Sequence, residues 1–364
     1  MDAVWGDFRR KGIECGFLGD FFTMSLFFAS AGGSPPRLFR FFAPALASCA
    51  LAGLAAAAIA AGIIDAYSAQ IITVAAVNAL LAISVNVITG FAGQLSLGQA
   101  GFMAIGAYTC IFLSLDAHLP LPVCAIAAGL AAAACALLVG FPCLKLSGDY
   151  LAIATLGFGE IIRVVLTNLR AVTGGANGRQ FTTALAVNPA LSFTVATLSL
   201  ILAAALFQNF NRSTYGRAIQ AVREDEIAAN SSGINTFRYK MAAFVCAGFI
   251  AGVGGSLYAM VVGFVKPDLA SFTKSIDYLI FAVLGGMGSL TGSVIASYVL
   301  TILPEALRFL NDYRLLFYPV ILILVMLFRP QGLLGMKEFS FAFLWRVWQQ
   351  KISRRAAKPG GAAP

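Results

Sequence analysis

Long apolar runs, separated by short polar segments, dominate this chain. A helix needs about 20 apolar residues to cross the hydrocarbon core of a bilayer, and several of the runs meet or exceed that length. Asp, Glu, Lys and Arg are absent from residues 41–64, 66–115, 117–144, 180–211, 241–265 and 278–304. The pattern therefore predicts an all-α fold, a polytopic integral membrane helix bundle.

One of these runs, residues 66–115, is too long for a single crossing. Its middle is rich in glycine and reads "TGFAGQLSLGQAG", so we expect two helices with a break between them. Further crossings are expected within 149–169 and at 315–328. By window length and rise per residue, about ten transmembrane helices are predicted, near residues 39–64, 67–89, 93–115, 120–144, 149–169, 190–210, 240–264, 276–287, 290–306 and 314–329.

The distribution of Lys and Arg supports an orientation for this bundle. Cytoplasmic segments collect basic residues. With the N-terminus inside, 18 Lys and Arg fall on inner segments, 6 on outer segments and one inside a helix. This bias predicts cytoplasmic N- and C-termini, an even number of crossings, and a cytoplasmic loop at 211–239.

Composition agrees with a membrane protein and divides the chain into three parts. Of the 364 residues, 59% are hydrophobic and 11% charged, whereas about 25% are charged in soluble domains. The net charge of +9 is best explained by anchoring to anionic lipid, because the basic residues flank apolar spans. We interpret residues 1–38 as a cytoplasmic or interfacial extension, 39–336 as the transmembrane domain, and 337–364 as a basic, disordered tail.

Motifs for catalysis and nucleotide binding are absent from the sequence. There is no G-x-x-x-x-G-K-[ST] loop, no HExxH, no GxSxG and no cluster of cysteine ligands. The chain has one histidine, His118, and its seven cysteines form no CxxC pair, which argues against a metal site or a catalytic triad. We therefore expect no enzymatic activity, and no cofactor or metal bound by this chain.

Polar side chains in the broken-helix region form the first candidate site. Gly98, Gly101 and Gly106 let helix backbones approach closely, and lipid does not tolerate unpaired polar groups, so the polar residues should face protein or water. Candidates for lining a translocation path are Asn78, Asn86, Gln94, Ser96 and Gln99. The alternative is that these residues only hold helices together.

The second candidate is a pair of opposite charges inside a predicted span. A charge near the centre of a span costs about 2.5–3.5 kcal/mol on insertion scales. Glu160 and Arg163 are three residues apart, which places them on one helix face within reach of each other. We expect them to pair and to face the interior of the bundle, either lining or gating a path or serving as a purely structural ion pair.

The third candidate is the mixed-charge run "REDEIAANSSGIN" at residues 223–235. Asp225, Glu226, Ala228 and Ala229 suit a short helix, the next four residues suit its end, and the following span should begin near Tyr239. We expect a short cytoplasmic helix parallel to the membrane. A solvated connecting loop is the alternative, as for most charge runs.

Six blocks of the sequence carry a resemblance to a known family. They are "GQLSLGQAGFMAIGAY", "YLAIATLGFGEIIR", "TGGANG", "GRAIQAVREDEIAANSSGIN", "AVLGGMGSLTGSVIA" and "LFRPQGLLG". The chain resembles, from about residue 67 to 336, the permease subunits of ABC importers for branched-chain amino acids, where these blocks occur in the same order. With "REDE" and "TGGANG" it resembles the longer of the two permeases that pair in that system.

The resemblance implies a transmembrane permease subunit in the bacterial inner membrane. Its partners would be a second permease subunit, two cytoplasmic P-loop ATPase subunits that hold ATP and Mg, a periplasmic solute-binding protein and membrane lipid. The solute would be a branched-chain or related hydrophobic amino acid. The scaffold also resembles importers of urea and short-chain amides, which is the alternative for the solute.

The resemblance further implies that the loop at 211–239 is a coupling helix that sits in a groove of the ATPase. The family pattern there is E-A-A, three residues, G, but Ile227 occupies the glutamate position, so a neighbouring charge should make the contact. The candidates for ATPase coupling are Arg223, Glu224, Asp225, Glu226, Ala228, Ala229 and Gly233. A second departure is Gln99, which follows "SLG" where the family commonly has His, so no pH-dependent role is expected there.

The sequence leaves two other classes of protein function open. The first is a self-sufficient ion-coupled carrier, with Glu160 and Arg163 as its ion or proton site. The second is a membrane-embedded enzyme, which the absent catalytic motifs disfavour. A carrier of the first kind would need no partner protein, whereas the importer would.

Overall fold

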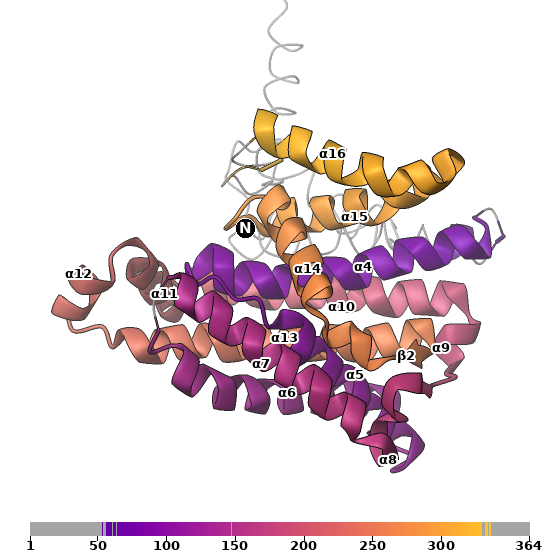
Figure 1. The fold of residues 1–364 in the computed structure, drawn as a ribbon, viewed down its shortest axis with the longest axis horizontal. Coiled ribbons are helices and arrows are strands. Elements are labelled where there is room, and N and C mark those ends of the chain that lie inside the picture. The colour runs from indigo at the N-terminus through magenta and orange to yellow at the C-terminus, as the bar shows by residue number, and fades with distance from the viewer. Residues whose placement is uncertain are drawn as a thin grey trace, which may run out of the picture. The chain divides into compact units, whose positions relative to one another are not determined.

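Helices make up nearly all of the chain that the computed structural model describes (Figure 1). It describes residues 64–146 and 148–329, together with 53, 56–59, 61–62, 332–333 and 335. Our expectations for residues 1–38 and 337–364, and for most of the first span at 39–64, lie outside these residues. Each of the other predicted spans overlaps a helix.

Five helices in the described part are long and apolar enough to cross a membrane. They are α4 (Ala66–Asn86) with the π-helical turn η1 (Val87–Phe91) that continues it, α6 (Leu121–Cys143), α7 (Asp149–Asn168), α10 (Pro189–Arg212) and α13 (Thr236–Val262). Shorter helices are α5 (Gln99–Leu115), α14 (Phe272–Gly285), α15 (Leu290–Ala306) and α16 (Arg314–Phe328). Large apolar side chains such as Leu130, Leu138 and Leu202 are exposed on the long helices, as contact with lipid requires. The architecture is that of an all-α, multi-pass membrane protein.

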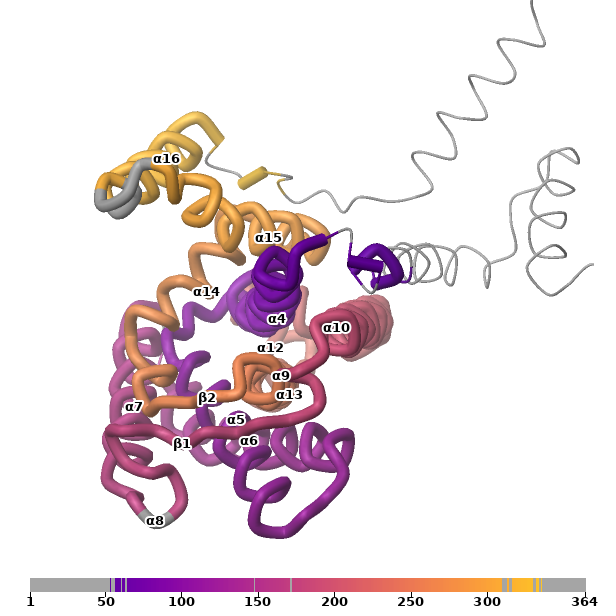
Figure 2. The backbone as a smooth tube through the Cα atoms, turned by 90° about the vertical axis from the view of Figure 1, so that its right-hand side faces the viewer, coloured from indigo at the N-terminus to yellow at the C-terminus, as the bar shows by residue number. Residues whose placement is uncertain are grey.

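Helix α13 lies at the centre of the packing and contacts α4, α5 and α6 (Figure 2). Small residues make these contacts close: a Cβ added to Gly106 would lie 2.2 Å from the carbonyl oxygen of Gly252, and one added to Gly255 would lie 1.9 Å from that of Met103. Without a hydrophobic driving force between helices in lipid, such backbone approach supplies the van der Waals contact that holds them together.

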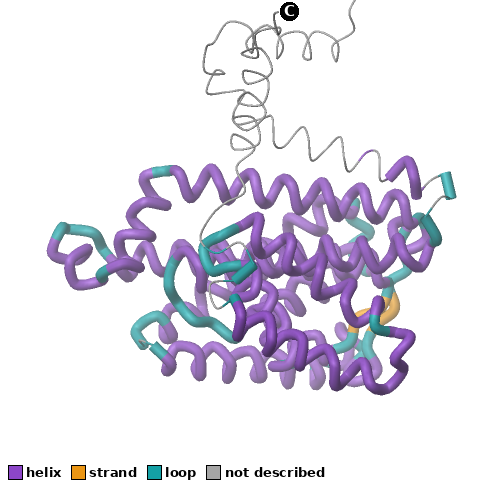
Figure 3. Tube along the Cα trace, turned by 90° about the horizontal axis from the view of Figure 1, so that it is seen from above, coloured by secondary structure: helices purple, strands orange, loops and turns teal. Residues whose placement is uncertain are grey.

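The short elements gather at the two ends of the long helices (Figures 1 and 3). At one end lie α11 (Thr214–Glu224) and α12 (Glu226–Ser231). At the other end are α8 (Arg170–Thr173), η2 (Gly175–Asn177), β1 (Arg179–Gln180), α9 (Ala184–Val187), β2 (Phe264–Val265) and η3 (Pro267–Ala270), and η4 (Arg308–Tyr313) joins α15 to α16. The strands pair antiparallel, with Arg179 opposite Val265. Arg179 also bonds Asp116 at 2.9 Å, and this hydrogen bond lowers the pKa of the Asp116 carboxyl.

The break inside the run at 66–115 is present, but the second helix begins later than predicted. We expected it near residue 93, whereas α5 begins at Gln99 and residues 93–98 are not helical. Gly93 has a φ of +67°, a conformation that ends a right-handed helix. The Leu97 N–H is donated to Thr155 Oγ1 at 3.1 Å instead of to a helical carbonyl. A contact with a distant helix therefore helps to keep this segment out of a helix.

Candidate functional site

The polar side chains of the break are buried in protein. Gln94, Ser96 and Gln99 are 5%, 2% and 1% exposed. Gln99 Oε1 accepts a hydrogen bond from Ser84 Oγ at 3.4 Å. Among the described residues, the Gln94 side-chain amide, the Ser96 hydroxyl and Gln99 Nε2 reach no partner. Buried polar atoms of this kind are costly, and they supply free donors and acceptors next to the first turn of α5.

Asn86, by contrast, has all its hydrogen-bonding groups engaged. Its Oδ1 accepts from the Gly288 N–H at 2.8 Å, and its Nδ2 donates to Ser289 O at 2.9 Å and to Ser293 Oγ at 2.7 Å. The residue is fully buried and ties the end of α4 to the turn between α14 and α15. This geometry matches the interpretation that it holds helices together.

Asn78 lies two turns earlier in α4 and makes one such contact. Its Nδ2 donates to Thr301 Oγ1 of α15 at 3.1 Å. The two asparagines thus form a polar seam between α4 and α15, separate in their bonding from the unpartnered atoms of the break.

Glu160 and Arg163 pair as predicted. Arg163 Nε donates to Glu160 Oε2 at 2.7 Å, and the side chains are about one third exposed, at 33% for Glu160 and 37% for Arg163. Glu160 Oε1 also accepts from the Phe272 N–H at 3.3 Å, and Arg163 Nη1 lies 3.9 Å from Asp268 Oδ1. The pair therefore faces η3 and the start of α14, where both charges have partners.

The loop after α10 contains two short helices where the sequence predicted one. Ser213 caps α11, since its side chain accepts from the Gly216 N–H at 3.3 Å. Asp225 Oδ1 accepts from the N–H groups of Ile227 and Ala228, both at 2.9 Å. We expected Asp225 inside the helix, whereas it is the N-cap of α12, which interrupts the helical run after Glu224. The signal for α11 was available in the cap position of Ser213.

The far end of this loop follows the prediction more closely. Helix α12 includes Ala228 and Ala229 and ends at Ser231. Gly233 has a φ of +83°, the left-handed conformation that commonly follows a helix end. The next helix begins at Thr236, three residues before Tyr239.

The four charges that the sequence singled out have different environments. Glu226 Oε2 pairs with Lys240 Nζ at 2.6 Å, and Arg223 Nη1 donates to the Gly90 carbonyl. Glu224 is exposed and makes no hydrogen bond or ion pair with any described residue. Together with the cap role of Asp225, this leaves Glu224 as the charge that is free to meet a partner.

Ile227 is a second exposed feature, next to these charges at the junction of α11 and α12. Its side chain is 81% exposed, although aliphatic side chains are usually buried. The junction of α11 and α12 therefore offers one exposed aliphatic side chain, Ile227, three residues from the carboxylate of Glu224.

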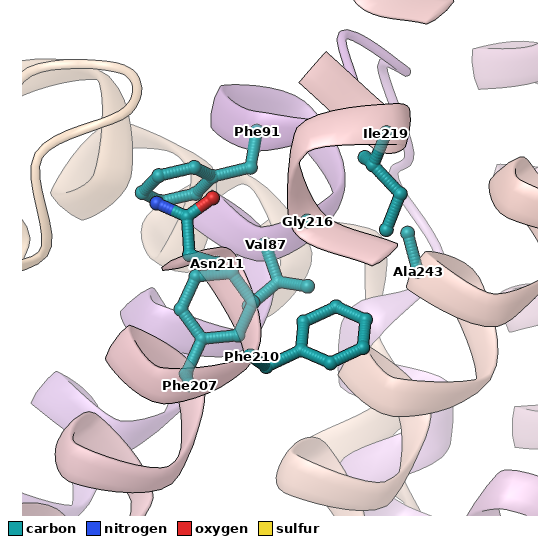
Figure 4. A pocket seen from close by; sticks show the side chains of 8 residues that line it. All are labelled: Val87, Phe91, Phe207, Phe210, Asn211, Gly216, Ile219 and Ala243. Carbon is teal, nitrogen blue, oxygen red and sulfur yellow. The ribbon is translucent and has the colours of Figure 1, made fainter. Parts of the chain in front are cut away.

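A small apolar pocket lies beneath α11 (Figure 4). Its cavity volume is about 10 Å³, no more than the space that one water molecule needs. Its walls include Val87 and Phe91 of η1, Phe207 and Phe210 of α10, Ile219 of α11 and Ala243 of α13. The interface between α11 and the end of α4 is thus nearly filled, as is typical of protein interiors.

Known proteins resemble this chain over most of the described helices. Residues 67–326 match the family described as "Branched-chain amino acid transport system / permease component". The high-affinity branched-chain amino acid transport system permease protein LivM of Escherichia coli (strain K12) is 38% identical over 262 residues, which covers 64% of this chain and 62% of the relative. This chain thus spans less than two thirds of that relative's length.

Two further relatives match shorter stretches. The permease protein LivH of the same E. coli strain is 35% identical over 147 residues, covering 40% of this chain and 46% of LivH. The permease protein BraD of Pseudomonas aeruginosa is 36% identical over 131 residues, covering 35% of this chain and 42% of BraD. No solved structure matches the chain. The family match covers well over half of the sequence, from α4 to α16, and the chain belongs to the permease component family of branched-chain amino acid transport systems.

Proposed function

We propose that this chain is a permease subunit of an ATP-binding cassette importer and forms the translocation path for branched-chain or related hydrophobic amino acids. The observation that carries the proposal is the family match, which includes the exposed helix pair α11 and α12. The relatives LivM, LivH and BraD are named as high-affinity branched-chain amino acid transport permeases. We assign the chain to the bacterial inner membrane, with the α11–α12 end in the cytoplasm.

The chain has no P-loop, so the energy for transport comes from other subunits. We propose two cytoplasmic ATPases that hold ATP and Mg, a second permease subunit and a periplasmic solute-binding protein as partners. Closure of the ATPases displaces α11 and α12, and the helix bundle moves between inward-open and outward-open states. The docked binding protein releases solute into the outward-open state.

We propose that the unpartnered polar atoms of the break are the part of the path that contacts the solute. Gln94, Ser96 and Gln99 carry buried donors and acceptors without partners. The ammonium and carboxylate groups of a passing amino acid can bond to them, which offsets the cost of leaving these atoms bare. Glu160 and Arg163 already have partners. Their place in the wall of the path stays a prediction.

The junction of α11 and α12 gives a specific prediction for ATPase docking. Changing Glu224 to Lys should reverse the one charge of Arg223, Glu224, Asp225 and Glu226 whose side chain has no partner among the described residues. Changing Ile227 to Asp should place a charge where an apolar contact is expected. Each variant should insert normally but lower ATP-driven uptake by about tenfold, because contacts at the centre of an interface dominate its affinity. Uptake of labelled leucine into vesicles holding the whole complex measures this.

Asp225→Ser is the matched control for that prediction. It removes a neighbouring charge and keeps a side-chain oxygen for the N-cap of α12, since serine is as good a cap as aspartate. Its uptake should stay close to that of the unmodified complex. Normal uptake by both Glu224→Lys and Ile227→Asp would show that the junction of α11 and α12 only connects helices and does not dock the ATPase.

The proposed function itself is tested by reconstitution. The chain alone, and the chain with a second permease and the two ATPases, are placed in liposomes with binding protein and labelled leucine. Uptake should occur only in the full complex and only with ATP. ATP-independent uptake by the lone chain would favour an ion-coupled carrier, and uptake of labelled urea or acetamide in place of leucine would assign the solute to that class.

A further inference from the structure

The side chain of Arg223 connects α11 to the end of α4. Arg223 lies in the last turn of α11, yet its side chain is partly buried and its Nη1 donates to the Gly90 carbonyl of η1. Arg217, about two turns earlier in α11, behaves differently. It is exposed, and its side-chain bonds to described residues go to Arg212 O and Thr214 Oγ1 beside it.

The Gly90 carbonyl is a natural acceptor for a cation. The last four carbonyls of a helix lack helical donors, and the end of the helix carries a partial negative charge. The chain leaves helical conformation after η1, and the amide of Gln94, inside the break, is donated to Ile88 O. Arg223 thus supplies a charge-assisted hydrogen bond at the point where the α4 helix stops.

Gly93 leaves room for this side chain, since a Cβ there would lie 2.8 Å from Arg223 Cγ. The guanidinium lies near Gly288, where a Cβ would be 3.5 Å from Arg223 Nη1, an ordinary contact distance. The stem of the arginine therefore passes the non-helical segment of the break, and its guanidinium ends beside the turn between α14 and α15.

That turn is itself fixed to α4. The Gly288 N–H is donated to Asn86 Oδ1 at 2.8 Å, and Asn86 Nδ2 holds Ser289 O and Ser293 Oγ. Arg223 of α11 thus reaches the point where three segments meet: the end of α4, the segment after it and the α14–α15 turn.

Apolar and charged contacts also tie α11 and α12 to the bundle. Ile219 of α11 lines a small apolar pocket together with Val87 and Phe91 of η1 (Figure 4), and dense packing of this kind transmits strain from one helix to the next. Glu226 holds α12 to α13 through Lys240, so the helix pair is attached to the bundle by charged contacts on both sides of the cap at Asp225.

We propose that Arg223 is a positioning residue that transmits displacement of α11 and α12 to the broken helix, through its bond to the Gly90 carbonyl. The proposal rests on the proposed importer function. When a partner moves the helix pair, the guanidinium pulls on the end of α4 and on the segment that carries Gln94 and Ser96. Loss of the bond leaves the partner attached but disconnects its motion from the path.

The test compares Arg223→Gln with Arg217→Gln in the complete complex in liposomes. Glutamine at 223 is too short to reach Gly90 and carries no charge. Membrane level, ATP hydrolysis and leucine uptake are measured together, and the readout is leucine transported per ATP hydrolysed. This ratio should fall by about tenfold in Arg223→Gln, within the range of coupling factors between linked sites, and should be unchanged in Arg217→Gln. A merely structural role would lower the amount of complex without changing the ratio.

A second variant covers the case in which Arg223→Gln does not assemble. Gly93→Ala keeps the arginine but places a methyl group 2.8 Å from its Cγ, so it should displace the side chain and lower the same ratio. An unchanged ratio in an assembled variant overturns the role of Arg223, and failure of both variants to assemble assigns the contact to folding instead. If the unmodified complex shows no ATP-dependent uptake, the proposed function fails and this inference fails with it.

Discussion

Replacing Asn86 with Asp should remove most of the folded protein from the membrane. The carboxylate would place an oxygen where Nδ2 now donates to Ser289 O, and two acceptors would face each other without a proton between them. Asn86 is 0% exposed, and an uncompensated charge in such a site costs about 3–5 kcal/mol. This is a large share of the 5–15 kcal/mol that stabilises a typical protein. The amount of monodisperse protein extracted in mild detergent, and its thermal unfolding midpoint, measure the loss.

Asn86→Leu and Asn78→Asp separate the causes of that effect. Leucine at 86 has a similar shape and no charge, but it leaves the buried Gly288 N–H without its acceptor, so it should cost about 1–3 kcal/mol. Asp at 78 faces a single hydroxyl, Thr301 Oγ1, which can turn and donate, and the position is only partly buried. The expected order of destabilisation is Asn86→Asp, then Asn78→Asp, whose charge near the middle of a span costs about 2.5–3.5 kcal/mol, then Asn86→Leu. An Asn86→Asp protein as stable as Asn78→Asp would contradict the bonding described for the α4–α15 seam.

The positions of the helices could be predicted because the bilayer sets the length of each span. The run at 120–144 became α6, with bounds Leu121–Cys143, and the run at 290–306 became α15, with bounds Leu290–Ala306. The Glu160–Arg163 pair was predictable for a similar reason, since two charges three apart on a helix must be neighbours. Whatever depends on local period and spacing can be predicted from the sequence of this chain.

Features that depend on distant contacts could not be predicted in this way. The start of α5 was missed because Leu95 and Leu97 keep the hydropathy high where the backbone is not helical. The bond that holds this segment, from Leu97 N–H to Thr155 Oγ1, spans 58 residues. The inward contact of Arg223 was missed because its acceptor, the Gly90 carbonyl, lies 133 residues away. A charge in a polar run is usually solvated, so the sequence favoured an outward-facing arginine.

The candidate site could likewise be predicted only in part, because the roles of its polar residues depend on distant contacts. The sequence grouped Asn86 with Gln94 and Ser96 because all three are polar residues in an apolar run. The structure separates them, since Asn86 is satisfied by the α14–α15 turn while the other two lack partners among the described residues. Burial alone does not distinguish a packing residue from one that could bind a solute. The hydrogen-bond partners do.

Replacing Gly255 with Ala should disrupt the packing of α13 against α5. The new methyl group would lie 1.9 Å from the carbonyl oxygen of Met103 and 3.1 Å from the Ala107 nitrogen. These are backbone atoms of a buried helix, so no change of rotamer relieves the overlap, and the two helices must separate. Overpacking of a core costs about 1–3 kcal/mol and occasionally more, and here the rigid backbone contact places the effect at the upper end. The thermal unfolding midpoint in detergent should fall accordingly.

Two other glycines in helices provide matched controls for this prediction. A Cβ on Gly254, the adjacent residue, would meet only side-chain atoms, with Leu81 Cδ2 nearest at 2.8 Å, and a Cβ on Gly157 of α7 would meet nothing within 4 Å. Gly254→Ala should therefore have an intermediate effect, because leucine methyls can move. Gly157→Ala should be neutral or stabilising by up to about 1 kcal/mol, since alanine loses less entropy than glycine in a helix. If Gly255→Ala proved no less stable than Gly254→Ala, the close approach of α13 and α5 would have to be abandoned as the basis of this packing.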